Sequence, residues 1–329
     1  MAFLRFGAPA RATAAEELGT PVFGVSLFEL AQRFFHAADG PGEAGGGGWS
    51  LRFLSALRGW QDDTVIAPSG VLEDGQRNLI LRPPADWPET GGTGNALDNV
   101  IRNESAVTAY IDGRGGDDTL IGGSGFDYFT FEGDFGHDRV DGGGGARNLI
   151  AFESDPVSVD FRAGTAASAG GSVAFTNVNV ALGSPFDDVL IGDDRGVILM
   201  GRDGDDRLVG GRGDDELWGE GGWGHPEAGS GNDTLDGREG KDVLAGGPGA
   251  DRFEFSTAPG PANADFILDF EPGIDTLVLH GEAHPGGLAR VSYDGASGEL
   301  WYQDPAAGAL LIATLGGAPA LAPGDLVLI

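Results

Sequence analysis

The chain has 329 residues, 60 of them glycine, no cysteine and a formal net charge of −31 at pH 7. A charge this negative disfavours binding to nucleic acid or to an anionic membrane surface, and it favours a multivalent cation as the partner. Without cysteine the fold has no disulfides, and no apolar run is long enough to cross a membrane as a helix.

Residues 1–90 precede the regular part of the sequence and are expected to form a small, partly helical segment. Ser26 opens a capping box that predicts a helix ending at Gly40, and residues 49–57 predict a second short helix. Residues 71–81 predict a strand, a turn and a second strand.

The aromatic side chains of residues 1–90 allow two interpretations. They form the core of a cap on the rest of the chain, or they form a surface that binds a partner, such as a cell surface, a polysaccharide or a second copy of the chain. Residues 1–20 lack the sustained apolar stretch of a secretory signal peptide, so secretion would require a different signal.

From residue 91 onward the sequence is dominated by a nine-residue pattern. A first block, residues 91–150, holds four units in 113–150, and a second block holds eight units in 183–254. The shared pattern is G-G-x-G-x-D-x-U-x, where U is apolar. Of the twelve units, eleven begin with glycine, nine have aspartate at position six and eleven are apolar at position eight. Agreement at several positions over so many units is specific, whereas a lone glycine motif is not.

Each unit predicts a glycine-rich turn followed by a very short strand whose position-eight side chain points into the core. Two units make one coil, so units two apart stack about 4.8 Å from each other in one sheet. Position-six aspartates then form rows, and carboxylate and carbonyl oxygens are the ligands that calcium prefers. The pattern therefore predicts a solenoid with calcium between its turns. A disordered linker would not need apolar residues at fixed spacing.

An unbroken period predicts which position-six residues stack in the second block. One row holds Asp188, Asp206, Gly224 and Asp242, and the other holds Val197, Asp215, Asp233 and Asp251. We expect the best sites between residues 188 and 206, 215 and 233, and 233 and 251, with gaps at Val197 and Gly224.

The same register applied to the first block predicts that Asp118 stacks on Asp138. Asp127 would face Arg147, which cannot bind a cation. Asn99 occupies the aspartate position of a degenerate unit before the first complete one.

Residues 151–182 alternate between apolar and polar and predict that the solenoid continues without calcium turns. Residues 255–329 contain the segment D-F-I-L-D-F-E-P-G-I-D at 265–275. An alternating strand and a Pro-Gly turn followed by a strand at 276–279 predict a cap on the last coil. Residues 291–329 contain further short β-type runs and an apolar end.

The nonapeptides, the segment at 265–275 and residues 291–329 together resemble RTX (hemolysin-type calcium-binding) proteins over about residues 90–329. The resemblance implies a mainly β fold, a parallel β-roll with a partly helical N-terminal segment and a β C-terminal cap. It also implies several Ca²⁺ ions, an extracellular or cell-surface location, and export by an ABC-type type I secretion system that recognises residues 291–329. The candidate calcium ligands are Asp118, Asp127, Asp138, Asp188, Asp206, Asp215, Asp233, Asp242, Asp251, Asp265, Asp269 and Asp275.

No catalytic motif is evident. The sequence has no H-E-x-x-H, no G-x-S-x-G and no cysteine, and its five histidines are scattered. We therefore expect a non-catalytic calcium-binding protein with a structural, surface-layer, matrix or adhesion role. The alternative is an extracellular carbohydrate-active lyase, hydrolase or epimerase that uses the β-roll as a scaffold, with Tyr110, Arg114 and Tyr128 as candidate groove residues.

Overall fold

The computed structural model describes residues 63–221 and 230–329, and these ranges are almost entirely β-structure. The helices predicted at 26–40 and 49–57 lie outside the described residues. Within the described ranges the one helical element is the 3-10 turn η2 (Gly287–Arg290), and none is long and apolar enough to span a membrane.

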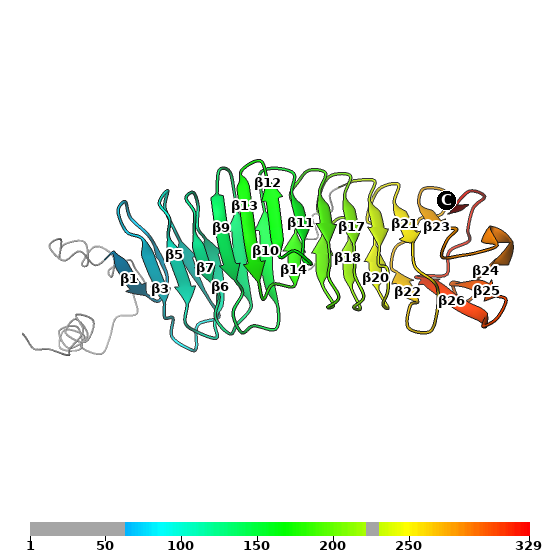
Figure 1. Ribbon diagram of the computed structural model, residues 1–329, viewed down its shortest axis with the longest axis horizontal. Helices are drawn as coiled ribbons and strands as arrows, with labels where there is room; N and C mark the ends of the chain where they lie inside the picture. Colours follow the sequence, from blue (N-terminus) through cyan, green and yellow to red (C-terminus); the bar gives the residue numbers. More distant parts are fainter. Residues whose placement is uncertain (1–62, 222–229) are drawn as a thin grey trace, which may run out of the picture. The chain divides into compact units, whose positions relative to one another are not determined.

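The strands alternate between two sheets, so that most coils contribute one strand to each sheet (Figure 1). Sheet A has the order β1 (Thr64–Ala67), β3 (Asn78–Leu81), β5 (Val100–Asn103), β7 (Thr119–Ile121), β9 (Gly136–Asp141), β13 (Gly171–Thr176), β12 (Thr165–Ser168), β11 (Ser158–Asp160), β15 (Val189–Ile191), β17 (Arg207–Val209), β19 (Thr234–Asp236), β21 (Arg252–Phe255), β23 (Thr276–Leu279) and β27 (Leu326–Leu328). Sheet B has the order β2 (Gly70–Val71), β4 (Glu89–Thr93), β6 (Thr108–Asp112), β8 (Asp127–Phe131), β10 (Asn148–Phe152), β14 (Val180–Leu182), β16 (Ile198–Met200), β18 (Glu216–Trp218), β20 (Val243–Ala245), β22 (Asp265–Ile267), β26 (Gly308–Leu315), β25 (Glu299–Asp304) and β24 (Val291–Asp294). The parallel β-roll is therefore confirmed.

The core between the sheets consists of the position-eight side chains. Six leucines at this position have 0% exposure, as the repeat predicts: Leu190, Leu199, Leu208, Leu217, Leu235 and Leu244. Each strand contributes only one or two inward side chains, so every coil depends on them.

Truncation of one core leucine should therefore be costly. We expect Leu217→Ala to lower the free energy of unfolding in saturating calcium by about 2–5 kcal/mol, because it leaves a cavity between the sheets. Denaturant unfolding would measure the loss. Val189→Ala, on a side chain that is 36% exposed, is the control and should change stability by much less.

The sheets begin before the first nonapeptide. Strand β1 pairs in parallel with β3, and β3 with β5, so residues 64–103 already form coils. Residues 71–81 are not a hairpin, because Val71 belongs to sheet B whereas β3 belongs to sheet A. The boundary expected at residue 90 therefore does not mark the start of the solenoid.

Residues 151–182 continue the solenoid, as predicted, but they also reverse direction. Strand β13 pairs in parallel with β9, and β11 pairs in parallel with β15. Between them β12 is antiparallel to both. This meander joins the two repeat blocks within sheet A without a calcium-type turn.

The second block does not keep its register throughout. Strand β17 pairs with β19, which aligns Leu208 with Leu235, and β18 pairs with β20, which aligns Leu217 with Leu244. The flanking strands thus pair as if the unit 219–227 were absent. Gly224 and Pro226, which break the pattern at positions six and eight of that unit, lie outside the described residues.

The C-terminal residues form the predicted β cap. Strand β22 pairs with β20 on one side and β26 on the other, and β27 pairs with β23. Strand β25 is antiparallel to both β24 and β26, and these strands close sheet B. In β22 the inward residue is Ile267, with 0% exposure, whereas Phe266 and Leu268 are about two-fifths exposed at 40% and 39%.

Candidate calcium sites

Two rows of carboxylates follow the solenoid, one beside each sheet. Along the regular parts of the rows, Oδ1 of the side chain accepts a hydrogen bond from the backbone N–H of the equivalent residue one coil earlier. In the row of sheet A these bonds join Asn99 to Asp118 (2.7 Å), Asp118 to Asp138 (2.8 Å), Asp188 to Asp206 (2.8 Å), Asp206 to Asp233 (2.8 Å), Asp233 to Asp251 (2.9 Å) and Asp251 to Asp275 (3.0 Å). In the row of sheet B they join Asp127 to Asn148 (3.1 Å), Val197 to Asp215 (2.9 Å), Asp215 to Asp242 (2.8 Å) and Asp242 to Asp265 (3.2 Å).

Some predicted neighbours are confirmed. Asp118 stacks on Asp138, residue 188 on 206, and residue 233 on 251. Asn99 occupies the position of an aspartate, as predicted. Val197 leaves the row of sheet B without a carboxylate in its coil.

Two predicted neighbours are wrong. Asp215 stacks on Asp242 and not on Asp233, because β18 pairs with β20 across unit 219–227. After this unit, each aspartate therefore belongs to the opposite row from the one that the unbroken period predicts. Asp127 faces Asn148 and not Arg147, because the pairing of β8 with β10 is shifted by one residue. The shift also turns Ile150 into the core, in place of Leu149.

The second oxygen, Oδ2, divides the aspartates into two groups. In six of them it is buried and has no hydrogen-bond partner: Asp118, Asp138, Asp206, Asp233, Asp242 and Asp251. In Asp127 and Asp215 it accepts the backbone N–H of Gly123 and Gly211, both at 2.7 Å. A buried carboxylate oxygen without a donor is costly, so the first group is the one that fits a bound cation best.

The first glycine of a unit makes room for this oxygen. A Cβ atom at Gly113 would lie 2.1 Å from Oδ2 of Asp118, and one at Gly246 would lie 2.1 Å from Oδ2 of Asp251. Glycine is therefore required at this position, because the carboxylate oxygen lies where any other residue would have its Cβ atom. The carboxylate is surrounded by backbone atoms of the turn.

Buried like charges raise the pKa values of these aspartates. Burial, reinforced by the carboxylates of Asp233 and Asp188, raises the pKa of Asp206 to about 9. Burial and Asp251 raise the pKa of Asp233 to about 7. A divalent cation would remove this penalty, because it favours the ionised form.

Among the described residues, no three acidic or histidine side chains gather closely enough to hold an ion by themselves. Calcium takes six to eight oxygen ligands, so backbone carbonyls must contribute. The turns supply them: the carbonyl oxygen of Gly219 lies 2.6 Å from the Cβ position of Gly201, next to Oδ2 of Asp206. The aspartate rows therefore fit calcium bound by one or two carboxylates together with turn carbonyls.

A pH dependence follows for the calcium-free protein. The unfolded aspartates have pKa values near 3.8, whereas burial raises those of Asp233 and Asp251 to about 7 in the folded chain. In chelator, stability should be full below pH 4 and fall as the pH rises through this window, since folding requires protons there. Circular dichroism in chelator should show more β-structure at pH 5 than at pH 8. Saturating calcium should abolish or reverse that difference, and a calcium-free protein that is more folded at pH 8 would contradict the assignment.

The three aspartates of the cap differ in their contacts. Asp265 and Asp275 continue the two rows through Oδ1. Asp269 stands outside them, and its two oxygens accept the backbone N–H groups of Gly246 (3.0 Å) and Gly247 (2.9 Å). Asp265 and Asp275 are therefore the better candidates for ligands in the row positions.

Two asparagine side chains close turns through hydrogen bonds. Asn95 donates through Nδ2 to the carbonyls of Glu73 (2.9 Å) and Gln76 (2.8 Å). Asn148 donates in the same way to the carbonyl of Asn177 (2.9 Å). An amide supplies its own donors, so these turns are closed by hydrogen bonds.

Three buried acids were not predicted: Glu220, Asp236 and Asp325. Glu220 stands at position two of its unit, where the pattern has glycine, and it is 5% exposed. Burial, followed by the charge of Asp233, raises its pKa to about 8. The departure from glycine was the only signal for it in the sequence.

Of the residues proposed for an enzyme site, Tyr110 and Arg114 are exposed, whereas Tyr128 is partly buried against an apolar cluster of sheet B. Tyr110 and Tyr128 stack on the outer face of sheet B with ring centroids 4.6 Å apart, and Arg114 pairs loosely with Asp112 at 4.0 Å. The pairing of the two rings follows from the parallel register of β6 and β8.

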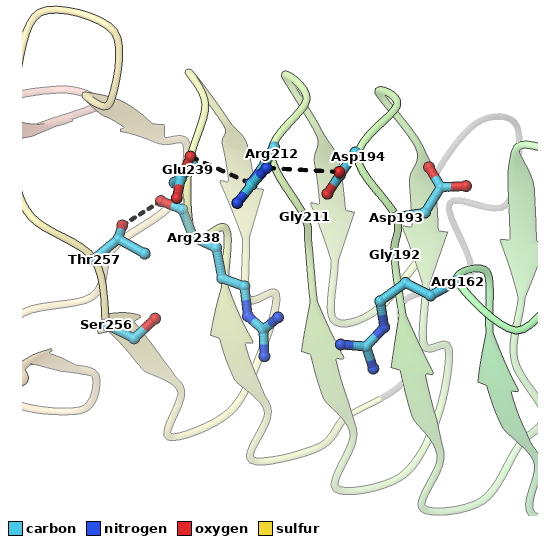
Figure 2. Close-up of a pocket in the computed structure, with 10 residues that line it drawn as sticks. All are labelled: Arg162, Gly192, Asp193, Asp194, Gly211, Arg212, Arg238, Glu239, Ser256 and Thr257. Carbon is cyan, nitrogen blue, oxygen red and sulfur yellow. Dashed lines mark hydrogen bonds and ion pairs between the residues drawn. The ribbon is translucent and has the colours of Figure 1, made fainter.

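A separate cavity of about 530 Å³ lies over the ends of β15, β17 and β19 (Figure 2). The side chains of Arg162 and Arg238 extend toward each other across it, and Arg212 lies between Asp194 (3.9 Å) and Glu239 (3.6 Å). Each of the three arginines at this cavity therefore forms an ion pair with a neighbouring carboxylate, which offsets its positive charge.

The two parallel sheets and the aspartate rows define a β-roll of the calcium-binding type. A family model of the RTX calcium-binding nonapeptide repeat matches residues 110–129, 130–149, 198–223 and 227–253. The chain is an RTX-repeat protein, and RTX repeats bind calcium.

Among solved structures, the chain is similar to the extracellular lipase LipA from Serratia marcescens, with 18% identity and a TM-score of 0.24. The match covers 79% of this chain and 42% of that chain, so this chain spans less than half of the lipase. At this TM-score the likeness gives no guide to activity. No curated protein matches the chain in sequence.

Proposed function

We propose that the chain is a secreted protein that folds when it binds calcium outside the cell, and that its role there is structural or adhesive. The observation that carries the proposal is the set of six buried aspartates whose Oδ2 atoms have no partner. Sites of extracellular type bind calcium in roughly the 0.1–1 mM range, so they would be empty in the cytosol and filled outside.

The export part of this proposal can be tested independently of calcium binding. We propose that an ABC-type type I system recognises residues 291–329, and that folding follows export. In a host carrying such a system, the full chain should appear in the medium and a chain ending at residue 290 should stay inside. Asp233→Asn is the matched control: it should be exported like the wild type, because its calcium site forms only outside. Equal export of the shortened chain would refute this role for the tail.

Attachment is proposed to involve residues 1–90. Alanine substitutions of aromatic residues within 26–60 should abolish binding to a cell surface, a polysaccharide or a second copy of the chain. The same variants should fold normally with calcium, as judged by circular dichroism. Unchanged binding by all of them would exclude this segment.

A further inference from the structure

Glu220 has a buried carboxylate whose second oxygen is not satisfied. Oε1 accepts the backbone N–H of Gly231 at 2.6 Å, whereas Oε2 is buried without a hydrogen-bond partner. None of the ion pairs among the described residues includes Glu220. A carboxylate that is 5% exposed and lacks a counter-charge needs either a proton or a cation.

The groups around Glu220 are themselves acidic. Asp233, Asp251 and Asp269 are its charged neighbours. The carboxyl group of Asp233 is close enough to share a hydrogen bond with Glu220 if either group carries a proton. The Oδ2 atom of Asp233 is also buried and without a partner, so two unsatisfied carboxylate oxygens from different coils lie in this region.

Backbone oxygens and tight packing complete the surroundings. The amide of Glu220 donates to the carbonyl of Gly246 at 3.2 Å. A Cβ atom at Gly247 would lie 1.6 Å from Oε2 of Glu220, and Gly247 also donates its amide to Asp269. The glutamate therefore fills space that glycine leaves open in the next coil, beside the cap residue Asp269.

We propose that Glu220 is a calcium ligand outside the nonapeptide pattern, and that it binds a Ca²⁺ ion together with Asp233 and turn carbonyls. Hard oxygen donors of this kind suit calcium. The ion ties the turn after β18 to the last coils, at the place where the register of the rows changes. This inference rests on calcium binding by the aspartate rows.

The test is the number of calcium ions bound per chain, measured by equilibrium dialysis and metal analysis of the full chain. Glu220→Gln should bind one ion fewer than the wild type and should show a smaller calcium-induced rise in Tm. In chelator it should be at least as stable as the wild type, because it removes a buried charge. Glu216→Gln, on the neighbouring strand β18, is the control and should bind the full number.

A second variant changes the same site without removing the carboxylate, and its fold is checked by circular dichroism in calcium. Gly247→Ala keeps Glu220 but places a methyl group on its Oε2 atom, so it should also lose that ion. If Glu220→Gln binds as many ions as the wild type with the same rise in Tm, Glu220 shares a proton with Asp233 and the inference is wrong. If the wild type itself binds no calcium, the proposed function fails as well.

Discussion

Asp233→Ala should destabilise the calcium-bound protein by about 4–6 kcal/mol. Asp233 accepts the amide of Asp206 and donates its own amide to Asp251, so it links three coils of one row. Removing the carboxylate leaves a buried amide unpaired, at a cost of about 1–3 kcal/mol. It also removes a calcium ligand, and each ion held at a hundred times its Kd contributes about 2.7 kcal/mol. Denaturant unfolding in calcium and in chelator would separate the two contributions.

Two further variants make this prediction specific. Asp233→Asn keeps an oxygen acceptor for the amide of Asp206, so it should lose mainly the calcium contribution. Asp203→Ala removes an exposed aspartate of the same block and should leave stability and calcium binding unchanged. If Asp233→Ala and Asp203→Ala behave alike in calcium, the buried row does not stabilise the fold.

Gly201→Ala should lower both stability and calcium binding, because the added methyl group has no room. Its Cβ atom would lie 2.0 Å from Oδ2 of Asp206 and 2.6 Å from the carbonyl oxygen of Gly219. Neither group can move without breaking the row or the ladder between coils, and overpacking of this kind typically costs about 1–3 kcal/mol. We also expect one calcium ion to be lost, because both displaced oxygens belong to the same candidate site.

Gly260→Ala provides the matched control. A Cβ atom at Gly260 meets nothing within 4 Å, so the same chemical change should be tolerated. Unfolding midpoints and calcium stoichiometry would be compared for both variants. If Gly201→Ala binds the full number of ions with wild-type stability, the glycine does not serve to hold the carboxylate.

The repeat predicted the parts of the fold that depend on local chemistry. A position-eight leucine is buried wherever a unit is complete, as at Leu208 and Leu217, because the turn and the strand are set within nine residues. Aspartates stack where consecutive coils are regular, as between Asp188 and Asp206.

Register was predicted less well, because it depends on pairing between segments that are distant in sequence. The period alone did not show that the strands on either side of unit 219–227 pair with each other, although the departures from the pattern at Glu220, Gly224 and Pro226 were visible. A single shifted residue before β10 likewise put Asn148 opposite Asp127. In both places the register of a coil depends on which strand it pairs with, and the nine-residue period does not predict that pairing.

The first coils were missed for a related reason. Strands β1 to β4 have no aspartate turn, and an asparagine such as Asn95 closes them through amide hydrogen bonds. A pattern built on aspartate therefore misses these first coils.

The central claim is that calcium folds this chain, and a calcium titration of the chelator-treated full chain, followed by far-UV circular dichroism, tests it most directly. We predict little β signal in chelator at pH 8 and a cooperative gain of β-structure as calcium approaches the millimolar range. A spectrum that is already fully β in chelator at that pH, and does not change with calcium, would contradict the account, since the buried aspartates would then be accommodated by packing alone.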